Sequence, residues 1–225
     1  RYLADGERLT VGLVLAGDKA PRGWASGKAA KFDAYDAKAE VLALLAAAGA
    51  PVDNLQVMPV PSAGKGGDAG GHFHPGQSAT LRLGPKTVLA SFGALHPATA
   101  KAFDLDGAVV VAEVYLDAIP AKRGAGGFMR AAYTPPPLQA VKRDFAFLVP
   151  DTLAAGDLVR AVRGADKANI VGARVFDRFE KDGQLSLAVE VTLQPTEKSY
   201  DEAALKAISH AVVAAAAKLG AELRS

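Results

Sequence analysis

The stretch that decides the fold is residues 170–193, IVGARVFDRFEKDGQLSLAVEVTL. Residues 170–179 are typical of a strand, and the alternating apolar side chains of residues 185–193 predict a second strand with one buried face. Lys181-Asp182-Gly183 lies between the two runs, and Asp-Gly is a strong signal for a tight β-hairpin. The sequence therefore predicts an antiparallel hairpin in the second half of the chain.

Strands and helices flank this hairpin in a regular order. They are a strand at 144–149, a helix at 154–163, a helix at 201–219 and a strand at 221–224. Asp151 or Thr152 is the expected N-cap of the first helix, and Gly220 is expected to end the second. The resulting order, β-α-β-β-α-β, is that of the split ferredoxin-like fold.

The first half of the sequence has a pattern that predicts a second α/β unit. Its expected elements are strands at 9–16, 55–60, 79–83, 87–95 and 108–116, helices at 32–48 and 99–103, and a glycine-rich loop at 61–71. Residues 122–127 (KRGAGG) indicate a flexible connection, and Pro135-Pro136-Pro137 favours an extended segment. We place the domains at 1–127 and 128–225. Since the chain does not begin with Met and enters a strand almost at once, we expect a fragment without its upstream partner strands.

Composition excludes several classes of protein. The 225 residues include 26 Lys and Arg against 24 Asp and Glu, which excludes a strongly basic nucleic-acid-binding arm. The absence of Cys excludes disulfides, thiolate nucleophiles and Cys-ligated zinc. No apolar run approaches the length of about 20 residues that a membrane span needs, and no signal peptide is visible.

The sequence contains no recognisable catalytic constellation. The glycines of residues 64–71 do not open a helix, as a phosphate-binding loop requires. His72 and His74 would point the same way on an extended segment, and His96 or Asp68 would complete a metal site. Turns fixed by the two His-Pro dipeptides explain the same histidines without a metal. We therefore expect neither a catalytic residue nor a bound metal in this chain.

The strand around residue 177 leaves two interpretations open. Strict alternation puts Val175, Asp177 and Phe179 on one face and the residues between them on the other. Phe179 then either packs in the core beside Val175, or shares an open sheet face with Asp177. In the second case the ring stacks on a nucleic-acid base and the carboxylate accepts hydrogen bonds from its edge. The pattern alone favours neither.

Six segments, in order along the chain, resemble those of one family. They are Phe32-Asp33-Ala34-Tyr35-Asp36-Ala37-Lys38, His74-Pro75-Gly76-Gln77-Ser78-Ala79, Phe92-Gly93-Ala94-Leu95-His96-Pro97, Val110-Val111-Ala112-Glu113, Lys142-Arg143-Asp144-Phe145-Ala146 and Phe176-Asp177-Arg178-Phe179. On these segments the chain resembles the C-terminal part of the β subunit of bacterial phenylalanine–tRNA ligase. The resemblance implies a non-catalytic, class II synthetase-like domain with an antiparallel sheet at 1–127. It implies a ferredoxin-fold anticodon-binding domain at 128–225.

The resemblance also implies a function. An α subunit pairs with the β subunit in an (αβ)2 tetramer, which attaches phenylalanine to tRNA(Phe) in the cytoplasm using ATP and magnesium. This segment is expected to bind the anticodon region and to contribute to assembly, without a cofactor of its own. The alternative is a freestanding ferredoxin-like module that binds RNA or a small regulatory ligand, since this fold serves many roles.

The family's pattern places the first anticodon base at Asp177 and Phe179. Four basic residues of the second half are further expected RNA contacts: Lys142, Arg143, Arg178 and Lys198. The sequence departs from the family at Phe179, where Tyr is usual, so stacking is retained and a hydroxyl contact is lost. It also departs at Pro135-Pro136-Pro137-Leu138 and at the short turn Lys181-Asp182-Gly183.

Overall fold

The computed structural model describes residues 2–3, 6–60, 71–121 and 134–224. The chain divides into two compact units, residues 1–127 and 128–225. Most of the expected loop at 61–71 and the whole connection at 122–127 lie outside the described residues, as does Asp68. In the described part of the chain, every helix is too short or too polar to cross a membrane.

The first unit is built on a five-stranded antiparallel sheet in the order β3-β9-β8-β7-β6. Its strands are β3 (Thr10–Ala16), β6 (Gln56–Pro59), β7 (Phe73–Leu83), β8 (Thr87–Leu95) and β9 (Val109–Tyr115). Smaller elements are β1 (Tyr2–Leu3), β2 (Gly6–Glu7), β4 (Asp18–Ala20), β5 (Ala30–Lys31), α2 (Pro97–Ala102) and the 3-10 turns Val52–Asn54 and Leu116–Ala118. The strands predicted from hydrophobic runs are all present.

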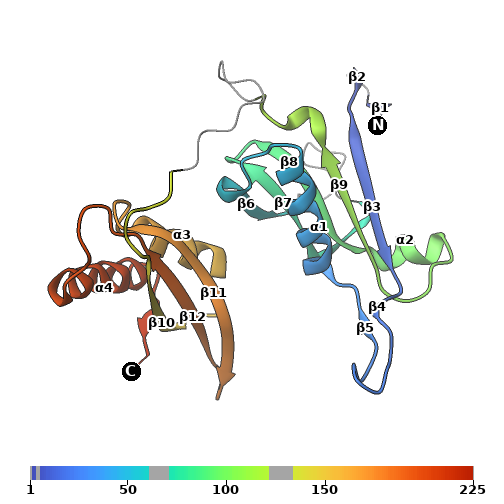
Figure 1. The fold of residues 1–225 in the computed structure, drawn as a ribbon. Coiled ribbons are helices and arrows are strands. Elements are labelled where there is room, and N and C mark those ends of the chain that lie inside the picture. Colours follow the sequence, from blue (N-terminus) through green and yellow to red (C-terminus); the bar gives the residue numbers. More distant parts are fainter. Residues whose placement is uncertain (1, 4–5, 61–70, 122–133, 225) are drawn as a thin grey trace. The chain divides into compact units, whose positions relative to one another are not determined.

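Helix α1 (Ala34–Ala47) covers one face of this sheet (Figure 1). It begins at a capping box, in which the Asp33 carboxylate accepts from the Asp36 N–H and the Asp36 carboxylate accepts from the Asp33 N–H. Such reciprocal bonds satisfy backbone donors that the first helical turn leaves without partners. Val41 and Leu45 are fully buried and form, with the inner side chains of β8 and β9, the core of the unit.

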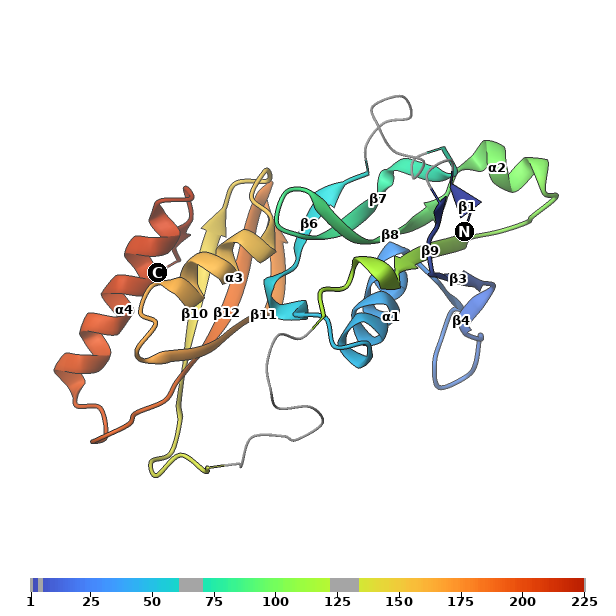
Figure 2. The same cartoon turned by 90° about the horizontal axis from the view of Figure 1, so that it is seen from above.

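The second unit contains the predicted β-α-β-β-α-β order. Its elements are β10 (Val141–Val149), α3 (Ala155–Gly164), β11 (Ile170–Lys181), β12 (Gln184–Leu193), α4 (Glu202–Ala217) and β13 (Glu222–Leu223). The strands form one antiparallel sheet in the order β11-β12-β10-β13. Both helices lie on one face of it (Figure 2), where Phe147, Leu158, Val189 and Val212 are fully buried. The α/β fold class with a ferredoxin-like second domain is confirmed.

The two local predictions for this unit, the Asp-Gly hairpin and the N-cap of α3, have opposite outcomes. The Asp-Gly hairpin is confirmed, because Asp182 and Gly183 have φ of 52° and 75°, as a two-residue turn matching the strand twist requires. The N-cap prediction for α3 is wrong. Its N-cap is Ala154, which makes no side-chain cap bond, because a separate turn closed by the Leu153 N–H to Pro150 O bond precedes the helix.

Candidate nucleic-acid interface

Strand β11 contains two residues more than its partner strand requires, and the second of them lies beside Asp177. Val175 and Asp177 pair with consecutive residues of β12, so Phe176 between them has no cross-strand partner. This is a β-bulge, and it shifts the alternation of side chains by one residue. Asp177 and Phe179 consequently lie on the face opposite to Val175.

The strict alternation predicted from the sequence is therefore wrong at this point. Val175 packs against the core beneath the helices. Phe179 pairs instead with Ser186 on the other face and keeps 51% of its surface exposed. Of the two interpretations, the structure excludes Phe179 as a core residue beside Val175 and places its ring on an open sheet face.

We call the side of the second sheet away from α3 and α4 the open face. The strand registers place on it Lys142, Asp144, Ala146, Leu148, Arg174, Asp177, Phe179, Ser186, Ala188, Glu190 and Thr192. The side chains in the middle of this face are short, because Ala146 and Ala188 pair with each other there. Larger polar and aromatic side chains stand at its two ends.

One end of the open face is an ion-paired cluster around Glu190. The Glu190 carboxylate accepts from Arg174 Nε at 2.9 Å and from Lys142 Nζ at 3.2 Å. The hydrogen bond from Arg174, together with the one from Lys142, holds the pKa of Glu190 below its ordinary value, and the same carboxylate raises the pKa of Arg174. Much of the positive charge at this end is thus already balanced within the sheet.

The other end is formed by Asp177, Phe179 and Arg224. Within the described residues, the carboxylate of Asp177 makes no hydrogen bond or ion pair, so it is available to a ligand. Arg224 follows β13 and is held by its backbone N–H, which donates to Ala146 O at 2.8 Å. Its guanidinium carbon lies 5.9 Å from the centroid of the Phe179 ring, within the range of a cation–π contact.

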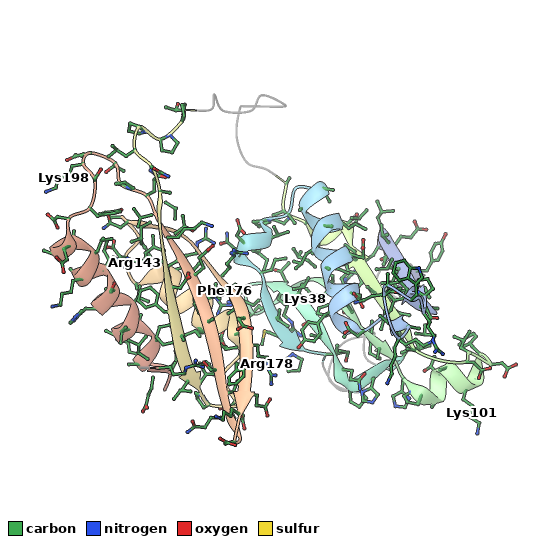
Figure 3. All side chains as sticks on the ribbon, turned by 60° about the horizontal axis from the view of Figure 1, so that its bottom comes forward. Lys38, Lys101, Arg143, Phe176, Arg178 and Lys198 are labelled. Carbon is green, nitrogen blue, oxygen red and sulfur yellow. The ribbon has the colours of Figure 1, made fainter. Side chains whose placement is uncertain are left out.

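The other predicted basic residues lie away from this end. Arg143 pairs with Val191 and Arg178 with Leu187, so both project on the helix side of their strands, and Arg178 donates to Glu180 at 2.8 Å. Figure 3 labels both, with Lys198 in the connection between β12 and α4. Of the six predicted contacts, the structure brings Lys142, Asp177 and Phe179 onto the open face.

Lys198 belongs to a separate hollow of about 440 Å³ between the α3–β11 and β12–α4 connections. Here the Tyr200 hydroxyl donates to Asn169 Oδ1 at 2.9 Å, and Asn169 Nδ2 donates to Asp166 Oδ2 at 2.7 Å. Burial, with the nearby Asp166 charge, raises the pKa of Tyr200. These bonds tie the two connections together, so the hollow has a structural explanation.

Two of the three histidines of the first unit serve as turn caps. His74 Nδ1 accepts from the Gly76 N–H and His96 Nδ1 from the Ala98 N–H, each at 3.1 Å. The two His-Pro segments are also neighbours, since the His96 N–H donates to His72 O at 2.7 Å. Among the residues that the structure describes, no three His, Asp or Glu side chains gather as a metal site would require.

The face of the first sheet away from α1 carries a polar network. Ser91 is fully buried and its hydroxyl lies 3.3 Å from that of Tyr115, which donates to Glu113 at 3.0 Å. Thr80 accepts from Arg82 Nε at 2.8 Å and donates to Met58 O at 3.1 Å. The Ser91–Tyr115 and Thr80–Met58 bonds join neighbouring strands. Together the four bonds satisfy hydroxyls that would otherwise be buried without partners.

Comparison with known proteins agrees with this geometry in both units. Residues 5–116 match the sequence model of the phenylalanyl tRNA synthetase beta chain CLM domain, and residues 136–224 match that of the ferredoxin-fold anticodon binding domain. The chain belongs to the phenylalanine–tRNA ligase β-subunit family. The resemblance found in the sequence segments is thereby confirmed.

Similar phenylalanine–tRNA ligase beta subunits cover almost the whole chain. The chain is 68% identical over 233 residues to that of Novosphingobium aromaticivorans and 49% identical over 229 residues to that of Zymomonas mobilis, with 100% of the chain covered in both. It is 44% identical over 224 residues to that of Rhodospirillum rubrum, with 97% covered. The chain spans about 28% of the length of these relatives.

Sequence reasoning missed two features of the open face. One is the pairing of Lys142 and Arg174 with a common carboxylate, Glu190, which only the strand register brings together. The other is Arg224, which reaches Phe179 from the far edge strand of the sheet. The sequence predicted a last strand at 221–224, but it did not indicate that an arginine side chain following that strand would extend across the open face.

Proposed function

We propose that this chain is the segment of a phenylalanine–tRNA ligase β subunit that binds the anticodon region of tRNA(Phe). Residues 1–127 form the end of a non-catalytic class II synthetase-like core that contributes to subunit assembly, and residues 128–225 form the anticodon-binding domain. In the (αβ)2 assembly with the α subunit, the enzyme attaches phenylalanine to tRNA. Since charged tRNA supplies translation, we place this assembly in the cytoplasm.

ATP and magnesium belong in this proposal to the assembled enzyme. Magnesium is bound by carboxylates and substrate phosphates, and among the described residues of this chain no cluster of potential ligands gathers for it. The role proposed for this chain is recognition and assembly.

The observation that carries the proposal is the joint placement of Asp177 and Phe179. Their side chains lie on the open face at one end of the sheet, the carboxylate without a partner in the described residues and the ring half exposed. A carboxylate accepts hydrogen bonds from the donor edge of a guanine, while an aromatic ring stacks on the face of an unpaired base. The pair thus supplies both an edge contact and a face contact for one nucleotide.

The four basic residues are proposed to contact the RNA backbone. Lys142 has three donors, and its pairing with Glu190 leaves donors for a phosphate. Arg143 and Arg178 project from the opposite side of their strands, so they would contact RNA only where it passes the sheet edges. Lys198, in the β12–α4 connection, would contact a more distant phosphate.

The decisive experiment is Asp177→Ala in a titration with the tRNA(Phe) anticodon stem-loop at fixed salt. A lost base-edge contact is expected to weaken binding by about 1–3 kcal/mol. Asp151→Ala removes the same charge from an exposed turn of the same domain and is expected to leave affinity unchanged. Unchanged affinity in Asp177→Ala, or an equal loss with a stem-loop of another anticodon, contradicts the proposal.

A further inference from the structure

Arg224 and Phe179 come from opposite edges of the second sheet and meet over its middle. Phe179 lies on β11 and Arg224 follows β13, which are the two outer strands in the order β11-β12-β10-β13. Beneath them the open face is low, with Ala146 and Ala188 paired across the two central strands. Ser186 lies on this face but is only 4% exposed, which shows that neighbouring side chains cover this part of the sheet.

We propose that Phe179 and Arg224 are the two walls of a slot that takes one unpaired base, with Arg224 stacking on the side of the base away from the ring. The proposal rests on the anticodon-binding function proposed above and adds Arg224 to its recognition site. A planar guanidinium stacks on an aromatic base as well as on an aromatic side chain. Binding of the base would then replace the cation–π contact between Arg224 and Phe179 with two stacking contacts, one on each face of the base.

The spacing of the two walls supports this arrangement. The guanidinium carbon and the ring centroid are 5.9 Å apart. A base stacked between them needs two layers of about 3.4 Å, or about 7 Å in total, so the walls must separate by about 1 Å. Arg224 can yield by that amount through rotation of its long side chain, while its backbone stays anchored by the bond to Ala146 O.

The charges around the slot agree with a guanidinium used as a wall. Arg178 is held by Glu180, and Arg174 and Lys142 are held by Glu190. The Arg224 side chain, in the described residues, forms only the weak contact with Phe179 and no ion pair. Among the arginines of the open face, it is therefore the one whose planar group is available to a ligand.

The test compares Arg224→Ala and Arg224→Lys in the 225-residue chain, with the tRNA(Phe) anticodon stem-loop as the probe. Loss of a stacking wall is expected to weaken binding about three- to tenfold. Arg224→Lys keeps the charge and loses the planar group, so it is expected to bind nearly as weakly as Arg224→Ala. Arg163→Ala removes the same charge from the exposed side of α3 and is expected to leave affinity unchanged.

A second probe reports on the slot itself. A stem-loop with 2-aminopurine at the first anticodon position is expected to lose fluorescence on binding to the wild-type chain, and to lose clearly less with Arg224→Ala. A stem-loop lacking that base is expected to bind wild type and Arg224→Ala equally, because neither wall then has a base to contact. Circular dichroism confirms that each variant is folded.

Three results would overturn the inference: full affinity in Arg224→Ala, full recovery in Arg224→Lys, or tighter binding in Arg224→Ala. The second would assign Arg224 to a phosphate, and the third would show that it competes with the base for Phe179. Failure of the proposed function looks different. In that case the wild-type chain does not bind the stem-loop, or Asp177→Ala binds it as well as wild type does.

Discussion

Among the described glycines of the first unit, Gly93 of β8 is the position where one added methyl group should be most destabilising. Its φ of +151° lies in a region that residues with a side chain rarely adopt. A Cβ there would lie 2.4 Å from Gln77 O, 2.4 Å from Ser78 Cβ and 2.5 Å from Ser78 Cα. The contacts include backbone atoms, which cannot rotate away. They arise because His74-Pro75-Gly76-Gln77 form an irregular segment of β7 between the pairs Phe73–Leu95 and Ser78–Gly93.

The magnitude for Gly93→Ala follows from two contributions. Backbone strain at such a φ is about 1–3 kcal/mol, and forcing an atom into a packed site adds about 1–3 kcal/mol. We therefore expect a loss of about 2–6 kcal/mol in the free energy of unfolding of the first unit. Since domains are stable by only about 5–15 kcal/mol, a loss at the upper end of the expected range would leave a unit of low stability close to unfolding.

Native-state hydrogen exchange is the appropriate assay, because it reads the two units separately. Amides of β7, β8 and β9 should exchange faster in Gly93→Ala, while those of β10 and β12 serve as an internal reference. Gly12→Ala is the matched control in the same sheet, since its Cβ would meet no heavy atom within 4 Å and its φ is not positive. That variant should change stability by less than about 1 kcal/mol. A loss of less than about 1 kcal/mol in Gly93→Ala would refute the reasoning, because it would require the facing β7 backbone to move freely.

The remaining predictions concern the ion-paired end of the open face. Glu190→Gln removes a carboxylate whose pKa is lowered from 4.5 by Arg174 and Lys142. Its stabilising effect is fully present above the unfolded-state pKa and is lost as the pH falls through the lowered folded-state pKa. The difference in unfolding free energy between wild type and variant, measured by urea titration, should therefore shrink from neutral pH to about pH 3; a constant difference speaks against the ion pairs. Lys142→Ala should weaken binding to all stem-loops alike and reduce the slope of log affinity against log salt by about 0.7. A loss confined to the cognate stem-loop would show that Lys142 does not contact a phosphate.

Local signals were sufficient to predict the second unit because each element carries its own. Asp201 caps α4 by accepting from the Ala204 N–H at 2.7 Å, and Gly220 ends the helical segment with φ of +75°. The Asp182-Gly183 turn fixes the register of β11 against β12 near the turn. When period, cap and turn agree in this way, strand order follows from the few topologies that a split β-α-β unit allows.

The bulge at Phe176 could not be predicted, since alternation in one strand says nothing about its partner. A bulge exists only relative to the facing strand, and Val175, Phe176 and Asp177 contain no glycine that would mark one. Without knowledge of the bulge, a core position for Phe179 was as plausible as a position on the open face. The N-cap prediction for α3 failed for a similar reason. Asp151 and Thr152 belong to a separate turn before the helix, and the pattern of one segment does not reveal that turn.

The net charge of +2 acquires a more specific meaning from the open face. At one end, Glu190 forms ion pairs with Lys142 and Arg174. This end therefore offers RNA less unbalanced positive charge than two free basic side chains would. At the other end the bulge brings Asp177, an anion, beside Phe179, which would repel a phosphate and suits a base edge. Binding through such a face must depend more on stacking and hydrogen bonding than on counterion release, and its affinity should therefore fall less steeply with salt than that of a basic groove.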